Sequence, residues 1–235
     1  MKGTDIMKII YWSDYACPYC YIGEVRMKKA LSELGIDADL EMKAFQLDPY
    51  AGQHAESDTV TRFAKKYMLS KEQAAANIAH ISKLGEAEGL DFKYATTLFT
   101  NTMDAHRLTK LAQSKSAELA DAVSEKLYKA YFTDNLELAD RGLLTKIGTE
   151  CGLDKAEITE MLESGKYEDE VRLDEREASR YGIHGVPYFV INGKLAISGA
   201  EATDTLKLAL AKAAKEEAVK PAQGMTCGPD GCKIG

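Results

Sequence analysis

A chain of 235 residues with 45% hydrophobic residues is long enough to form one large domain or two small ones around a substantial core. Its net charge of −7 and pI of about 5.3 argue against nucleic acid and against an anionic membrane surface as partners. No stretch approaches the roughly 20 apolar residues of a membrane-spanning helix, and the amino-terminal residues lack the apolar core of a secretory signal. We therefore expect a cytoplasmic protein. In a reducing compartment, its five cysteines are more often redox-active or metal-binding than structural.

The first strongly patterned stretch, residues 8–23, has the sequence KIIYWSDYACPYCYIG. Residues 9–12 are four consecutive apolar or aromatic side chains, which predict a short buried strand. After a polar turn and two cysteines, apolar side chains recur with helical period over residues 22–34. Cys17 and Cys20 are therefore expected where a strand ends and a helix begins.

This position has chemical consequences for the two cysteines. Pro18 suits the first helical turn, where its missing N–H would have no intrahelical partner. The unpaired N–H groups and partial positive charge of a helix N-terminus favour a thiolate over a thiol. Cys17, the outer of the pair, would attack a disulfide, and Cys20, one turn further in, would resolve the mixed disulfide. Half of a zinc site and a pair of core cysteines are the alternative interpretations.

The middle of the chain is predicted to be helical. The first helix ends near Gly35, and residues 38–47 then alternate apolar and polar side chains as a second strand does. From there to about Tyr181 no convincing strand pattern occurs. The expected helices are 61–68, 71–88, 102–114, 117–132, 141–151, 155–164 and 167–181. The glycines at expected C-terminal caps are Gly89, Gly152 and Gly165.

Strand patterns return near the carboxyl end. Residues 187–192 and 194–198 are two short apolar runs, and the Asn192-Gly193 pair between them is a strong hairpin signal. Residues 203–219 carry leucine and alanine among lysine and glutamate, and they predict the last helix.

The order of these elements predicts the fold class. Strand–helix–strand, a helical insertion and then hairpin–helix correspond to an α/β thioredoxin-like fold. In this fold a central mixed sheet is flanked by helices, and here a large all-helical domain is inserted. We expect the two parts of the thioredoxin-like domain at 1–57 and 182–219, and the inserted helical domain at 58–181. A flexible C-terminal tail with a second cysteine pair would occupy 220–235.

Four stretches resemble the DsbA-like oxidoreductases, and within them the FrnE-like branch. They are WSDYACPYCYIG at 12–23, NTMDAHRLTKLA at 101–112, LYKAYF at 127–132 and GIHGVPYFVINGKLAISGA at 182–200. The resemblance covers nearly the whole chain. CPYC alone is only moderately specific because glutaredoxins share its central dipeptide. Its combination with the distant VPYF and the insertion is much more specific.

The resemblance implies a second part of the site at Pro187. In such folds this proline follows a cis peptide bond and lies against the cysteine pair. A cis-proline would also expose neighbouring backbone groups with which a substrate strand can pair. Val186 and Pro187, together with Pro18 and Tyr19, are therefore expected to dock substrate. The alternative is an ordinary trans proline at the start of an edge strand.

Several further side chains are candidate modulators of the cysteines. His184 lies two residues before Val186, and His106 lies in an insertion stretch that faces the site in the family. An imidazolium would favour the thiolate and a neutral imidazole could move protons, although a lone histidine is more often a surface or core residue. Asp14, Trp12 and Tyr19 are expected at the rim of the site.

The residue at Tyr19 also bears on direction. The strongest oxidants of the family have histidine at this position, so tyrosine suggests a less oxidising pair. A shift of about 30 mV corresponds to about 1.4 kcal/mol, so one lost interaction can change direction. With a cytoplasmic location, this favours a reductase or isomerase.

The tail holds a second cysteine pair, Cys227 and Cys232, around the sequence Gly-Pro-Asp-Gly, which suits a type I turn. We expect a second disulfide that exchanges electrons with Cys17–Cys20 or forms its own redox site. A similar pair occurs in some FrnE-like sequences. A solvated tail with incidental thiols and a zinc site shared by both pairs are the alternatives. Cys151 is expected to be a small buried hydrophobe.

The leading functional prediction is a thiol–disulfide oxidoreductase that acts on protein or small-molecule disulfides, with glutathione as a candidate partner. It requires no metal or organic cofactor. The first alternative is the related architecture of the kappa-class glutathione transferases and 2-hydroxychromene-2-carboxylate isomerases. Their first cysteine is typically serine, from which Cys17 departs. The second alternative is a non-catalytic, chaperone-like binder that uses the helical insertion as an apolar groove.

Overall fold

The computed structural model describes residues 6–218, 226–228 and 231–233. Its elements follow the predicted order, and most of their boundaries lie within about two residues of those expected. In chain order they are β1 (Met7–Ser13), α1 (Pro18–Leu34), β2 (Ala38–Ala44), α2 (Thr59–Tyr67), α3 (Lys71–Ala87), the 3₁₀ turn Tyr94–Thr96, α4 (Met103–Gln113), α5 (Ala117–Phe132), α6 (Arg141–Cys151), α7 (Lys155–Glu163), α8 (Glu168–Arg180), β3 (Tyr188–Ile191), β4 (Leu195–Ser198), α9 (Thr203–Ala218), β5 (Thr226–Gly228) and β6 (Gly231–Lys233).

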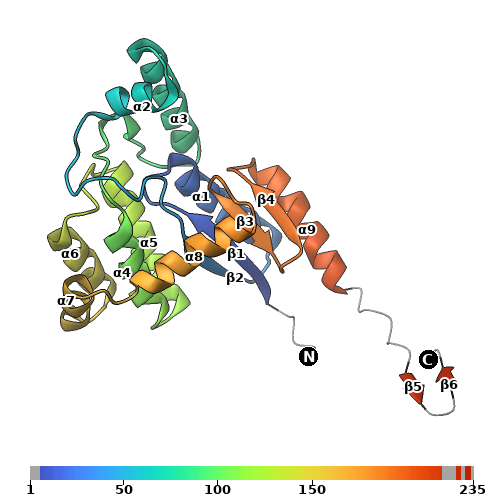
Figure 1. Ribbon diagram of the computed structural model, residues 1–235. Helices are drawn as coiled ribbons and strands as arrows, with labels where there is room; N and C mark the ends of the chain where they lie inside the picture. Colours follow the sequence, from blue (N-terminus) through green and yellow to red (C-terminus); the bar gives the residue numbers. More distant parts are fainter. Residues whose placement is uncertain (1–5, 219–225, 229–230, 234–235) are drawn as a thin grey trace.

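The centre of the fold is a four-stranded mixed sheet in the order β2-β1-β3-β4 (Figure 1). β1 pairs parallel with β2 and antiparallel with β3, and β3 pairs antiparallel with β4. The parallel pair is joined by α1, as a parallel connection requires a crossover. The predicted α/β thioredoxin-like fold with a large helical insertion is confirmed.

The alternation of side chains along β1 directs successive residues to opposite faces of the sheet. Ile9 and Tyr11 belong to the main core, which extends into α1 and the inserted helices. Trp12 belongs to a second, smaller core with Ala178 of α8 and Ile183. Its indole Nε1–H donates to the backbone carbonyl of Asp174 at 3.0 Å. Thus α8, which we expected as the last helix of the insertion, packs against the sheet (Figure 1).

Helix ends follow the predicted glycines in part. Gly35 and Gly152 cap α1 and α6 in the left-handed conformation, with φ of 62° and 101°. Gly89 also has positive φ and lies one residue beyond the cap of α3. The prediction for Gly165 was wrong, because α7 ends at Glu163 and its cap residue is Ser164, which has an extended backbone.

Both hairpins of the described chain have a regular register. Asn192 and Gly193 have φ of 50° and 66° between β3 and β4, as a type I′ turn requires. In the second hairpin, Cys227 of β5 lies directly opposite Cys232 of β6. The central residues of the predicted type I turn, 229 and 230, lie outside the described residues. No helix of the described part is long and apolar enough to cross a membrane.

Candidate active site

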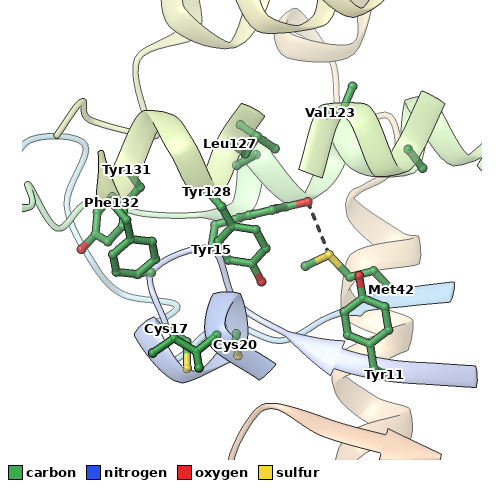
Figure 2. Close-up of a cluster of buried hydrophobic side chains, with 14 of the residues drawn as sticks. Tyr11, Tyr15, Cys17, Cys20, Met42, Val123, Leu127, Tyr128, Tyr131 and Phe132 are labelled. Atoms are coloured by element: carbon green, nitrogen blue, oxygen red, sulfur yellow. Dashed lines mark hydrogen bonds between the residues drawn. The ribbon is translucent and has the colours of Figure 1, made fainter. Parts of the chain in front are cut away.

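The junction of β1 and α1 positions both candidate cysteines. Cys17 is the N-cap residue of α1, with extended backbone (φ −93°, ψ 113°), and Pro18 is the first helical residue. The Cys17 amide donates to the carbonyl of Asp14 at 3.0 Å, which closes the turn after β1. Both thiols are free and buried, with exposed fractions of 4% for Cys17 and 1% for Cys20. Aromatic side chains of α5 pack beside them (Figure 2).

Cys20 lies in a buried environment that disfavours a thiolate. Burial raises its pKa well above that of a free thiol, and the nearby Cys17 sulfur adds to this shift through a hydrogen bond and its charge. A hydrogen bond from the Ser13 hydroxyl acts in the opposite direction. The Ser13 Oγ lies 2.5 Å from the hydroxyl oxygen of Tyr128, which is fully buried on α5.

This environment sets the order in which the two thiols can react. While Cys17 carries negative charge, that charge helps to hold Cys20 protonated. Once the Cys17 sulfur is part of a mixed disulfide it is neutral, so this contribution to the raised pKa of Cys20 disappears. The arrangement therefore allows Cys20 to become a nucleophile after Cys17 has reacted.

The loop before β3 lies against Cys17. The Cys17 Sγ is 3.5 Å from the carbonyl oxygen of Val186, and the Val186–Pro187 peptide bond is cis. Pro187 itself is buried against α1. A Cβ placed on Gly23 would lie 2.9 Å from the Cγ of Pro187, so glycine permits this close approach of helix and loop.

A cavity of about 500 Å³ opens at Cys17. The predicted residues Pro18, Tyr19, His184 and Val186 line one side of it. Helices α2 and α3 and the following turn supply the other side, which sequence reasoning missed. The cavity residues from this part are Arg62, Phe63, Lys66, Tyr67, Asn77, His80, Ile81 and Tyr94. No local pattern distinguished them, because both segments have the periodicity of ordinary surface helices.

Two of the expected rim residues are buried instead. Asp14 is 1% exposed, and its Oδ2 accepts a hydrogen bond from the backbone N–H of Leu47 at 2.8 Å. Trp12 is also 1% exposed and points into the smaller core beneath α8. Both predictions of a rim position were wrong, because hydrogen bonds with distant segments satisfy these polar groups inside the protein.

The structure also places the other two candidate residues, His106 and Cys151. His106 is 1% exposed on α4, does not line the cavity at Cys17, and places its Nε2 3.4 Å from the Oδ1 of Asp14. Cys151, at the end of α6, is only partly buried rather than a fully buried hydrophobe.

Comparison with known proteins identifies the family. Residues 8–211 match the family model described as a DSBA-like thioredoxin domain. The chain belongs to this DsbA-like family. A probable DsbA oxidoreductase from Streptomyces coelicolor has a similar structure, with a TM-score of 0.83 and 33% identity. That match covers 97% of this chain and 99% of the other.

Two further matches show how widely this architecture is shared. The uncharacterized protein YwbO of Bacillus subtilis (strain 168) is 26% identical over 212 residues, which covers 88% of this DsbA-like chain and 96% of that protein. A 2-hydroxychromene-2-carboxylate isomerase has a TM-score of 0.69 at 12% identity, over 90% of this chain and 98% of the isomerase. At this identity the likeness shows the fold alone.

Proposed function

We propose that the protein is a thiol–disulfide oxidoreductase in which Cys17 is the nucleophile and Cys20 the resolving thiol. The observation that supports this most strongly is the different placement of the two free sulfurs. Cys17 lines the cavity beside the Val186 carbonyl, whereas Cys20 is buried one helical turn further in. Membership of the DsbA-like family supports the same reaction class.

The proposed reaction proceeds in two exchanges. The Cys17 thiolate attacks one sulfur of a substrate disulfide, forms a mixed disulfide and releases the other sulfur as a thiolate. Cys20 then loses its proton and attacks the Cys17 sulfur, which forms the Cys17–Cys20 disulfide and releases the second substrate thiolate. The substrate gains two electrons and the protein dithiol loses them. The reverse sequence oxidises a substrate dithiol.

We favour reduction or isomerisation in the cytoplasm as the physiological direction. The residue between Pro18 and Cys20 is tyrosine, and Tyr19 is 40% exposed beside Cys17. Burial and the Cys17 charge raise the pKa of the Tyr19 phenol. Tyr19 is therefore neutral beside the Cys17 thiolate. A neutral phenol stabilises this thiolate less than a cationic side chain at the same position would.

The glutathione-dependent transferase or isomerase reaction is the alternative that shares this fold. In that reaction Cys17 would bind or orient glutathione and would not form a disulfide with Cys20. The free, adjacent Cys17 and Cys20 favour disulfide exchange instead.

A redox titration in glutathione buffers, with alkylation and mass mapping of every cysteine, tests the proposal. We expect Cys17–Cys20 to open and close at a potential between about −270 and −120 mV, the range of known exchangers. Cys17→Ser should abolish exchange, and Cys20→Ser should accumulate a mixed disulfide on Cys17. If Cys17 binds glutathione but never pairs with Cys20, the transferase or isomerase function is correct. Client binding that survives Cys17→Ser without any exchange would support a chaperone-like binder.

A further inference from the structure

The charged side chains that line the cavity at Cys17 are all basic. Arg62 and Lys66 of α2 line it, and among its lining residues in the described chain there is no aspartate or glutamate. This is unexpected in a protein with 37 acidic and 30 basic residues and a net charge of −7. The remaining lining is mostly aromatic, aliphatic or neutral polar. A reacting molecule therefore meets two permanent cations and no permanent anion at the nucleophilic sulfur.

Neither cation is neutralised by a neighbouring carboxylate. Within residues 6–215, where side chains are described, no acidic oxygen lies within 4.0 Å of the Arg62 guanidinium or the Lys66 ammonium group. The Arg62 guanidinium instead lies over the ring of Phe99, 3.0 Å from its centroid. Its charge also lowers the otherwise raised pKa of Tyr94, a cavity residue that is also affected by Cys17. Arg62 therefore lines the same cavity as Cys17.

A neighbouring cavity, also lined by α2, provides a contrast. It has a volume of about 670 Å³ and shares Arg62 and Lys66 with the first, but it also contains Lys65 and two carboxylates, Asp48 and Glu56. Its charges are therefore mixed, and the cysteines do not line it. Lys65 belongs to this cavity alone, on the same helix and next in sequence to Lys66.

We infer that Arg62 and Lys66 select low-molecular-weight disulfides that carry carboxylates. A volume of about 500 Å³ is that of a small-molecule site. A carboxylate on the half of the substrate that becomes bound to Cys17 would be paired by these cations. The same cations would stabilise the anionic leaving thiolate as the substrate S–S bond breaks. This inference rests on the proposed function, because it assigns the substrate class of that reaction.

The test uses three disulfides that differ in charge, namely 3,3′-dithiodipropionate, bis(2-hydroxyethyl) disulfide and cystamine. Reduced protein is mixed with each, quenched by alkylation, and the formation of Cys17–Cys20 is followed by mass spectrometry. Each rate is divided by the rate of the same disulfide with dithiothreitol, which removes differences in leaving-group reactivity. We expect the dianion to react at least about tenfold faster than the dication at low ionic strength, and the ratio to fall in high salt.

Variants connect the preference to the two side chains. In the Arg62→Gln/Lys66→Gln protein the dianion-to-dication ratio should fall to within about threefold. Lys65→Gln, which removes one positive charge from the same helix, should keep the wild-type ratio. Equal ratios in wild type and the double variant, or an equal loss in Lys65→Gln, would overturn the inference. Failure to form Cys17–Cys20 with any of the three disulfides would instead refute the proposed function, so the two failures are distinguishable.

Discussion

Ser13→Ala tests whether the hydrogen bond to Cys20 controls the second exchange. When Cys20 is a thiolate, the Ser13 hydroxyl donates to its sulfur, and the Tyr128 hydroxyl can then donate to the Ser13 Oγ at 2.5 Å. All three side chains are buried, with exposed fractions of 0% for Ser13 and Tyr128 and 1% for Cys20. No water replaces a lost partner easily in such a place, so the pKa of Cys20, already raised, should rise further.

The magnitude follows from the strength of this hydrogen bond. A hydrogen bond to a charged group contributes about 1.5–3 kcal/mol, which corresponds to about 1–2 pKa units. At a pH below the pKa of Cys20, the thiolate fraction then falls by about 10- to 100-fold. A more basic thiolate is a better nucleophile by about the square root of that factor, so the second exchange should slow by about 3- to 10-fold.

Acid quenching of a single turnover measures this step. In Ser13→Ala the mixed disulfide on Cys17 should accumulate, and the pH profile of its resolution should move about 1–2 units to higher pH. Ser124→Ala is the matched control, because Ser124 is also a buried hydroxyl but contacts Met42 and Tyr15 instead of the cysteines. An unchanged pH profile in Ser13→Ala, or an equal shift in Ser124→Ala, would refute the reasoning.

Three further substitutions test other parts of the structure. Gly23→Ala places a methyl group against Pro187, so we expect disulfide exchange to slow about three- to tenfold. Urea unfolding should show a loss of at most about 2 kcal/mol in the free energy of unfolding, because alanine also favours the helix. An unchanged exchange rate would contradict this expectation. Asp174→Ala leaves a backbone N–H of β2 and the partly buried Lys110 unpaired, so the free energy of unfolding should fall by about 2–4 kcal/mol. A loss below about 0.5 kcal/mol would show that these contacts contribute little. Replacing Cys227 and Cys232, which are opposite in their hairpin, by serine should slow turnover or reoxidation, and unchanged kinetics would remove the proposed relay between the two cysteine pairs.

The features predicted correctly are those encoded over a few neighbouring residues. The apolar run before the first cysteine pair, and the helical period after it, place Cys17 and Cys20 at a strand–helix junction. The Asn192-Gly193 pair supplies the two positive φ angles of its turn without help from the rest of the chain. Backbone preferences and hydrophobic period act locally, so they can be predicted from sequence.

Other features depend on contacts between distant segments. Asp14 appeared to be a rim residue, but the backbone of Leu47 satisfies its carboxylate inside the protein. Ser13 and Tyr128 meet although 115 residues separate them in sequence. No periodicity distinguishes such positions from surface ones, because burial of a polar group depends on which partners the fold brings to it.

The sequence by itself determined the order of elements, the thioredoxin-like fold class and the position of Cys17 and Cys20, since these follow from local propensity and patterning. The composition of the cavity was decided only by the tertiary structure. Arg62 and Lys66 lie 45 or more residues from Cys17 in the chain, and they reach its cavity only because α3 packs against α1 and α2 packs against α3 (Figure 1). The effect of a charge on a reactive sulfur depends on their distance in space, and sequence separation does not give that distance.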